Sequence, residues 1–171
     1  MYKRQPHGGD GPLYPGTCRR LSEDERRARI ASGKPYALRL DLSKALEIIG
    51  SRLTWQDSIH GEQIARPEEF GDAVIVRKDI GTSYHLAVVV DDGLQGVTDI
   101  VRGVDLFEST HLHRVLQQLL DLPAPVYHHH KLLTDDKGRR LAKRDKSITL
   151  KRLKGSGVSA AELKKELGFG V

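Results

Sequence analysis

The stretch SYHLAVVVDDGLQGVTDIVRG, residues 83–103, carries side chains that could line a binding site. It contains Tyr84, the adjacent Asp91 and Asp92, and Arg102 at the end of a second apolar run. A guanidinium can hold a carboxylate through two parallel hydrogen bonds, which makes Arg102 a candidate anion ligand. The residues alone leave two interpretations open, a buried hairpin or the wall of a binding site. The β-branched run AVVV locally favours a strand.

A second group of candidate residues is basic and lies near the C-terminus. Residues 131–171 hold 12 Lys and Arg against 5 Asp and Glu, whereas residues 1–130 hold 16 against 18. The formal net charge of +5 therefore comes from the last quarter of the chain. Such a segment suits contact with phosphate or nucleic acid, and it equally suits a solvated surface.

The remaining composition excludes several classes of protein. Cys18 is the single cysteine among 171 residues, so the chain is no disulfide-stapled secreted scaffold. The hydrophobic fraction of 38% and the charged fraction of 30% are typical of a globular, rather polar protein. No apolar run approaches a membrane span, and nothing at the N-terminus resembles a secretory signal. We therefore expect a soluble cytoplasmic protein.

Helical spacing marks three segments that could carry these side chains. Ser22 and Glu25 have the spacing of a capping box, which predicts a helix over residues 22–32. Leucines and a valine recur at helical intervals over residues 105–120, and this helix should pack one face on a sheet. Ser159 begins a second capping-box pattern that predicts a helix at the C-terminus.

Period-two alternation predicts the strands of the same fold, at residues 36–42, 52–59 and 72–78 and in VYHHHKLL. In a strand, His128 and His130 share one face while His129 points away, so this run offers at most a pair of metal ligands. Strands that alternate with helices indicate an α/β layer structure. Residues 1–12 are dense in Gly and Pro, and we expect them to be a disordered or non-native leader.

Three segments, taken in chain order, resemble a known family. SYHLAVVVDDGLQGVTDIVRGVDLFEST, LPAPVYHHHKLL and DDKGRRLAKRD are similar to the second half of the catalytic domain of class I glutamyl-tRNA synthetases. The resemblance runs from about Tyr14 to the end of the chain. The segment YPGTCR and the short C-terminus resemble the branch that attaches glutamate to the queuosine base of tRNA(Asp). A conventional glutamyl-tRNA synthetase fragment and a non-catalytic RNA-binding remnant are the two alternatives.

The resemblance implies a fold, which is the second half of a Rossmann-like class I catalytic domain with a short helical C-terminus. Residues 84–95 then form a helix instead of a strand, and TDIVRG forms a parallel strand whose C-terminal end is the usual place for ligands. The expected organisation is a leader over 1–13, a zinc-region remnant with inserted strands over 14–70, and the second Rossmann half over 71–130. Residues 131–171 then hold the lysine-signature loop and the C-terminal helices.

The resemblance also implies roles for individual residues in glutamate activation by ATP. Tyr84 and Arg102 occupy the glutamate-binding positions, with Arg102 as the carboxylate partner. The expected ATP ligands are Lys143, Arg140, Asp105 and His129, and Mg²⁺ accompanies the nucleotide. Lys143 matches the second lysine of the signature loop and is the candidate catalytic residue, because fixed cations stabilise the charge that develops on the phosphates. The alternatives are a packed tyrosine, a surface ion pair at Arg102, a solvated basic turn, and Asp105 as a helix cap.

Two parts of the family pattern are incomplete in this sequence. Tyr14 and Cys18 match the last two ligands of the zinc site in this branch, but the upstream Cys-x-Cys pair is missing, so the residues offer an incomplete half-site. Residues 1–13 also contain nothing like the HIGH motif that grips ATP. We therefore expect a fragment that is catalytically incompetent alone, from an enzyme that is monomeric when complete and acts on tRNA(Asp), glutamate and ATP.

Overall fold

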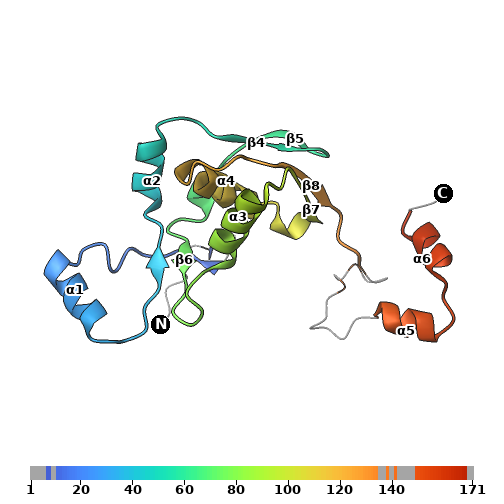
Figure 1. Ribbon diagram of the computed structural model, residues 1–171, viewed down its shortest axis with the longest axis horizontal. Coiled ribbons are helices and arrows are strands. Elements are labelled where there is room, and N and C mark those ends of the chain that lie inside the picture. Colours follow the sequence, from blue (N-terminus) through green and yellow to red (C-terminus); the bar gives the residue numbers. More distant parts are fainter. Residues whose placement is uncertain (1–6, 9–10, 135–137, 139–140, 142–148, 169–171) are drawn as a thin grey trace. The chain divides into compact units, whose positions relative to one another are not determined.

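The computed structural model describes residues 7–8, 11–134, 138, 141 and 149–168 (Figure 1). The chain divides into two compact units, Met1–His130 and Lys131–Val171. Each unit is described by itself. The first unit contains the four-stranded sheet and the helices packed on it, and it holds every described residue of the candidate site.

Short elements form the first part of the larger unit. Strands β1 (His7–Gly8) and β2 (Gly11–Pro12) pair antiparallel. Helix α1 (Glu23–Ala31) begins at Ser22 with both hydrogen bonds of a capping box, which confirms the predicted helix. None of its residues is buried, so local capping and charge, and not core packing, define this helix.

The strand predicted over residues 36–42 is wrong for most of its length. Strand β3 covers only Leu38–Arg39, and helix α2 (Leu42–Ile49) follows it directly. The side chain of Asp41 accepts a hydrogen bond from the backbone N–H of Lys44 and so caps the helix. The alternating leucines therefore belong to two elements, and the strand period ends at this cap.

The main sheet has the strand order β5-β4-β8-β7. Strands β4 (Thr54–Asp57) and β5 (Gly61–Ile64) form an antiparallel hairpin, of which the sequence predicted only the first strand. Strand β8 (Val126–His130) runs parallel to both β4 and β7 (Asp99–Gly103). The C-terminal ends of β4, β8 and β7 consequently meet at one edge of the sheet, the edge where open α/β sheets bind ligands.

Residues 84–95 are helical, so the local prediction of a strand for AVVV was wrong and the helix implied by the family resemblance is confirmed. Helix α3 spans Tyr84–Gln95, and the side chain of Ser83 caps it by accepting from the N–H of Leu86. Strand β6 (Val74–Val76) precedes the helix and pairs antiparallel with β3. The buried side chain of Val89 packs in the core, so burial outweighs the strand preference of the valines.

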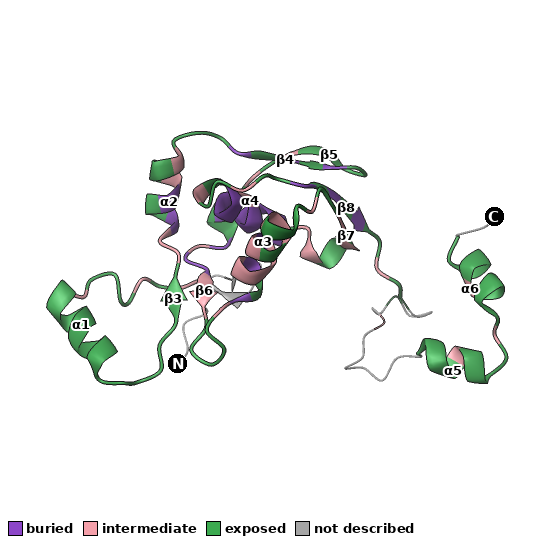
Figure 2. Ribbon diagram, viewed as in Figure 1, coloured by how far each residue is buried: buried purple, intermediate pink, exposed green. Residues whose placement is uncertain are grey.

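Helix α4 (Ser109–Leu119) lies at the centre of the unit, within the predicted segment 105–120 (Figure 2). The 3-10 turns η1 (Pro67–Glu69) and η2 (Val104–Leu106) are short, and η2 joins β7 to this helix. Leu112 and Leu116 pack against Val89 in one core cluster, and Val115 packs against α2 in another. Burial of each such side chain stabilises the fold by about 1.5–3 kcal/mol, so α4 holds the two clusters together.

The smaller unit contains two short helices, α5 (Leu150–Gly155) and α6 (Ala160–Glu166). Ser159 and Glu162 form both hydrogen bonds of a capping box, which confirms the predicted helix. In neither helix is any described residue buried. Within the described part of the chain, no helix has the length and apolar character needed to cross a membrane.

Candidate functional site

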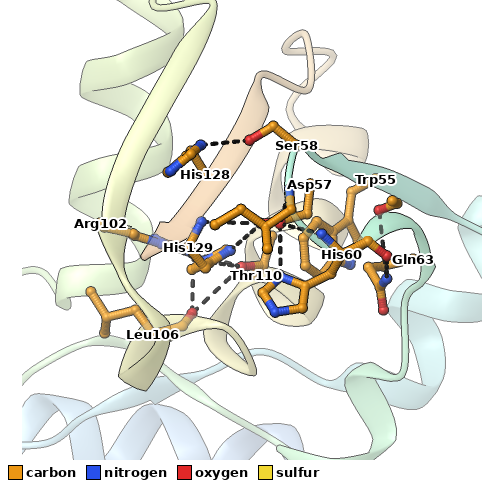
Figure 3. Close-up of polar contacts among 12 residues, drawn as sticks. Trp55, Asp57, Ser58, His60, Gln63, Arg102, Leu106, Thr110, His128 and His129 are labelled. Carbon is orange, nitrogen blue, oxygen red and sulfur yellow. Dashed lines mark hydrogen bonds and ion pairs between the residues drawn. The ribbon is translucent and has the colours of Figure 1, made fainter. Parts of the chain in front are cut away.

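Arg102 lies at the C-terminal end of strand β7, where the parallel register places it opposite His129 of β8 (Figure 3). Its guanidinium donates four hydrogen bonds to described residues. The acceptors are His129 Nε2 at 3.0 Å, His113 Nδ1 at 3.3 Å, the Leu106 carbonyl at 3.2 Å and Thr110 Oγ1 at 2.6 Å. These bonds use all but one of the N–H groups of the guanidinium.

All four acceptors around Arg102 are uncharged groups. Burial, together with the nearby Arg102 charge, lowers the pKa of His113 to about 2, so this ring is neutral at pH 7. Burial also lowers the pKa of His129, although the Asp57 carboxylate acts in the opposite direction. Among the described residues, no carboxylate forms an ion pair with Arg102. The half-buried guanidinium therefore keeps its positive charge available for an anion.

Asp57 lies at the end of β4 and is joined to this arginine through His129. Its Oδ2 accepts from His129 Nδ1 at 2.6 Å, and its Oδ1 accepts from the ring and backbone N–H groups of His60. Burial alone would raise the pKa of the Asp57 carboxyl, but these hydrogen bonds hold it well below its usual range. Asp57 is therefore ionised at neutral pH although its side chain is buried.

Tyr84 lies beside the same cluster, on the first turn of α3. Its ring centroid is 5.8 Å from that of His113, which in turn accepts from Arg102, and the tyrosine is 49% exposed. His113 Nε2 lies 3.0 Å from His85 Nδ1 of α3, so a buried histidine pair links the two elements. The structure thus brings Tyr84 and Arg102 to one place, with a hydroxyl-bearing side chain still accessible. That juxtaposition suits a small ligand with an anionic group.

The two aspartates of the opening stretch have separate environments. Burial raises the pKa of the Asp92 carboxyl, while the charge of Arg102 acts in the opposite direction. Asp91 is exposed on the same helix. The pair therefore does not converge on one point as two matched carboxylates would.

The ATP ligands expected from the resemblance fall in different parts of the chain. Lys143 and Arg140 lie outside the described residues. Asp105 is exposed in η2, close to the end of β7, and the cap of α4 involves no side-chain hydrogen bond. His129 has both ring nitrogens bonded to protein groups. The ATP-binding roles of these four residues stay predictions.

Tyr14 and Cys18, the expected zinc half-site, lie close together. The Tyr14 hydroxyl accepts a hydrogen bond from the backbone N–H of Cys18 at 2.6 Å, and the Arg39 guanidinium lies 4.5 Å from the centre of the tyrosine ring. A structural zinc ion needs about four ligands, and a neighbouring guanidinium disfavours a second cation. In the described ranges no three His, Cys, Asp or Glu side chains are grouped to hold a metal. The described residues therefore do not complete a zinc site.

Sequence reasoning missed three members of the cluster, Asp57, Thr110 and His113. Each lies on an element for which the sequence pattern predicted a strand or a helix but no functional role, and each is buried. One signal was present: Asp57 lies near the end of the strand predicted over residues 52–59, the region where parallel strands present ligand-binding residues. Thr110 and His113 carried no such signal, because buried polar residues within an amphipathic helix look like interruptions of its apolar face.

Comparison with known proteins places the chain in a family. Residues 3–167 match the model described as tRNA synthetases class I (E and Q), catalytic domain. The chain belongs to this family, and its α/β fold, with a mixed sheet in which β4, β8 and β7 are parallel, agrees with that assignment.

Within the family, similar relatives are named glutamyl-Q tRNA(Asp) synthetase. That of Rhodobacter capsulatus is 46% identical over 96% of this chain and 59% of its own length. That of Symbiobacterium thermophilum is 44% identical over 90% of this chain and 46% of its own length. A glutamate–tRNA ligase of Halorhodospira halophila is 37% identical over 91% of this chain and 31% of its own length. The chain spans about half the length of the glutamyl-Q relatives.

A solved structure shares the fold. The glutamate-tRNA synthetase of Elizabethkingia anophelis aligns with a TM-score of 0.60 at 26% identity, over 78% of this chain and 27% of that one. A glutamate tRNA ligase of Elizabethkingia meningosepticum, solved in complex with its amino acid, gives the same TM-score at 27% identity.

Proposed function

We propose that this chain forms the glutamate-binding part of an enzyme that activates glutamate with ATP and transfers it to the queuosine of tRNA(Asp). The observation that carries the proposal is the environment of Arg102, a half-buried guanidinium whose partners among the described residues are all uncharged. A cation in this state favours an anionic ligand, because a nearby carboxylate restores electroneutrality at the site. The family membership supports glutamate as that ligand.

In this proposal the glutamate side-chain carboxylate binds at Arg102. The accessible hydroxyl of Tyr84, across the His113 ring, adds a hydrogen bond. Because one guanidinium N–H has no acceptor among the described residues, the carboxylate either accepts a single bond from Arg102 or displaces one of its present acceptors, such as the Thr110 hydroxyl. Glutamine lacks the negative charge and would leave the arginine uncompensated. Selectivity for glutamate over glutamine follows from this charge.

By resemblance to the family, Lys143, Arg140, Asp105 and His129 are proposed as ATP ligands. Adenylate formation joins AMP to the glutamate α-carboxylate and expels pyrophosphate, so negative charge grows on the phosphates. The ammonium of Lys143 would stabilise that charge. Mg²⁺ would enter with ATP and neutralise its phosphates. Zinc has no complete set of ligands among the described residues, and no step depends on it.

The identity of the tRNA that receives glutamate distinguishes this proposal from a conventional glutamyl-tRNA synthetase. The names of similar relatives favour tRNA(Asp), whereas more distant ones are glutamate–tRNA ligases. The test measures transfer of labelled glutamate by the protein produced from its natural gene, with queuosine-containing tRNA(Asp) and with tRNA(Glu). We expect tRNA(Asp) to be labelled only when it contains queuosine. Labelling of tRNA(Glu) instead would support a conventional ligase.

A third outcome would exclude an enzymatic function. If the protein binds tRNA with an affinity that falls steeply with salt, yet catalyses no glutamate-dependent exchange of pyrophosphate into ATP, it is an RNA-binding protein without catalysis. The excess of 12 basic over 5 acidic residues in the last quarter would then account for the binding. We expect glutamate-dependent exchange, which that alternative does not allow.

A further inference from the structure

The Arg102 side chain belongs to a hydrogen-bonded chain that crosses four elements of the larger unit. The chain runs from Asp57 on β4 through His129 on β8 to Arg102 on β7, and onward through His113 on α4 (Figure 3 shows its first three members). Every contact in it is between 2.6 and 3.3 Å. Asp57, His113 and His129 are each at most 2% exposed, so water does not compete for these bonds.

The chemistry of its two ends fixes where each proton lies. Ionised Asp57 can only accept, so the proton of His129 must be on Nδ1. Arg102 can only donate, so His129 Nε2 must be the free lone pair that accepts from the arginine Nε–H. The requirements from both sides agree on one neutral tautomer of His129. Asp57 therefore makes this imidazole an acceptor that faces the arginine.

The same logic gives His113 the opposite tautomer. Its Nδ1 accepts from Arg102, so its proton is on Nε2, which donates to Nδ1 of His85. Two neutral histidines with opposite tautomers thus hold the guanidinium from two sides. Neither brings a negative charge into contact with it. The arrangement fixes the arginine plane without cancelling its charge, which a directly bonded carboxylate would do.

We propose that Asp57 and His129 are positioning residues that act through Arg102, holding its guanidinium at the angle that receives the substrate carboxylate. The inference rests on the proposed function, since Arg102 must be the carboxylate ligand. At metal sites, removal of a group that orients a ligating side chain by a hydrogen bond typically costs about 10- to 100-fold in affinity or activity, and we expect a loss of about tenfold for the orientation of Arg102. Neither Asp57 nor His129 touches the bound glutamate in this account.

The first test reads the tautomers and needs no ligand. In the 171-residue chain labelled with ¹⁵N-histidine, two-bond ¹⁵N–¹H correlations distinguish a protonated ring nitrogen from a bare one. We expect Nδ1–H for His129 and Nε2–H for His113 at pH 7. A charged His129, or one protonated on Nε2, would overturn the positioning role whether or not the chain binds glutamate.

The second test uses a pair of substitutions at one position. In His129→Gln the side-chain oxygen can reach the place of Nε2 and still accept from Arg102, whereas in His129→Asn the amide can only replace Nδ1 toward Asp57. The dissociation constant for L-glutamate, measured by titration calorimetry or NMR, should rise about tenfold in His129→Asn and less than about threefold in His129→Gln. Equal losses, or the reverse order, would mean that His129 acts only by filling space.

A matched pair of charge removals covers the case in which the histidine variants fail to fold. Asp57→Asn removes the buried carboxylate, and Glu62→Gln removes an exposed one on the partner strand of the same hairpin. We expect about tenfold weaker glutamate binding in the first and no change in the second. Unchanged binding in a folded Asp57→Asn variant would overturn the proposal. If the unmodified chain does not bind glutamate, the proposed function fails. The tautomers of His129 and His113 then still show whether the hydrogen-bonded chain has the expected arrangement of protons.

Discussion

Arg19 and Arg102 are both held by several hydrogen bonds, but their partners differ in charge. Arg19 donates to both oxygens of Asp72, at 2.8 and 2.5 Å, and lies 3.4 Å from Asp41. Arg102 donates to two neutral imidazoles, a hydroxyl and a carbonyl. Arg19 is thus neutralised by its neighbours, whereas no carboxylate in the described part of the chain forms an ion pair with Arg102.

This difference separates a structural arginine from a binding arginine. Asp72 also accepts from the backbone N–H of Leu42, so its ion pair with Arg19 ties the segment before α1 to the start of α2. An arginine in such a pair has little attraction left for a ligand. At Arg102 the fold supplies geometry through uncharged groups, and the carboxylate is left for the substrate to bring.

The largest effect should come from removing the uncompensated cation. Arg102→Gln should raise the dissociation constant for L-glutamate about 100-fold, because it removes the charge partner of a carboxylate in a partly desolvated site. Arg19→Gln is the matched control, and it should lower the melting temperature while glutamate binding stays within about twofold. Calorimetric titration checks both. Comparable losses of affinity in the two variants would erase the distinction between the arginines.

A smaller effect concerns pH, through the buried neutral His113. Its pKa is lowered to about 2 in the fold, against about 6.5 in the unfolded chain, so only the unfolded state takes up a proton as the pH falls below about 6.5. The free energy of unfolding should therefore fall by about 2 kcal/mol from this group alone between about pH 7.5 and pH 5. Urea denaturation at both pH values checks this.

The His113→Gln variant is the control for that pH dependence. Glutamine cannot titrate, so the variant should lose about 2 kcal/mol of the pH-dependent change whatever its stability at pH 7.5. The same slope in the variant and in the unmodified chain would show that His113 takes up its proton as readily in the folded state as in the unfolded state. The charged ring would then oppose the charge of Arg102 as the pH falls, and the lowered pKa that keeps His113 neutral would be refuted.

Tyr84→Phe should have a milder effect. The substitution keeps the ring beside His113 and removes only the hydroxyl, so glutamate binding should weaken about five- to tenfold, the usual range for one hydrogen bond. Tyr36→Phe provides a control, because that tyrosine is equally exposed and lies on a different part of the unit. An unchanged dissociation constant in Tyr84→Phe would remove the tyrosine from the ligand site and leave Arg102 alone there.

The smallest effect is expected at the capping residue of α1, on the Arg19 side of the comparison. Ser22→Ala should destabilise this helix by about 1 kcal/mol, seen as faster amide exchange over residues 23–31. Glutamate binding should not change, because α1 has no buried residue through which to act on Arg102. A loss of affinity in this variant would show that the two regions are coupled.

Local signals in the sequence predicted the elements that depend on local physics. The capping boxes at Ser22 and Ser159 each begin a helix as expected, because the bonds involved lie within four residues. The alternation in VYHHHKLL predicted β8 and placed His129 on the opposite face from its neighbours, as its burial confirms. The alternation over residues 36–42 gave a wrong prediction, because Asp41 caps α2 and ends the strand there.

Tertiary contacts decided the rest. AVVV has strand propensity and forms a helix because Val89 packs against α4, so only the family resemblance led to the correct prediction. The resemblance also singled out Tyr84 and Arg102, which the fold brings together. Asp57 escaped prediction because His129, which it bonds, and Arg102, which His129 bonds in turn, lie 72 and 45 positions further along the chain, and no local pattern reports such contacts. To predict a hydrogen-bonded chain of this kind, the order of the strands in the sheet must be known.

The most direct measurement is an NMR titration that observes the Nε–H group of Arg102 and the ring of Tyr84. L-glutamate added to the 171-residue chain should shift both signals along one saturable curve, while L-glutamine at the same concentrations should leave the Arg102 signal unchanged, because it brings no carboxylate side chain. Equal shifts with both amino acids, or a response to L-glutamate that leaves Arg102 unmoved, would contradict the claim that this uncompensated arginine binds the glutamate side chain.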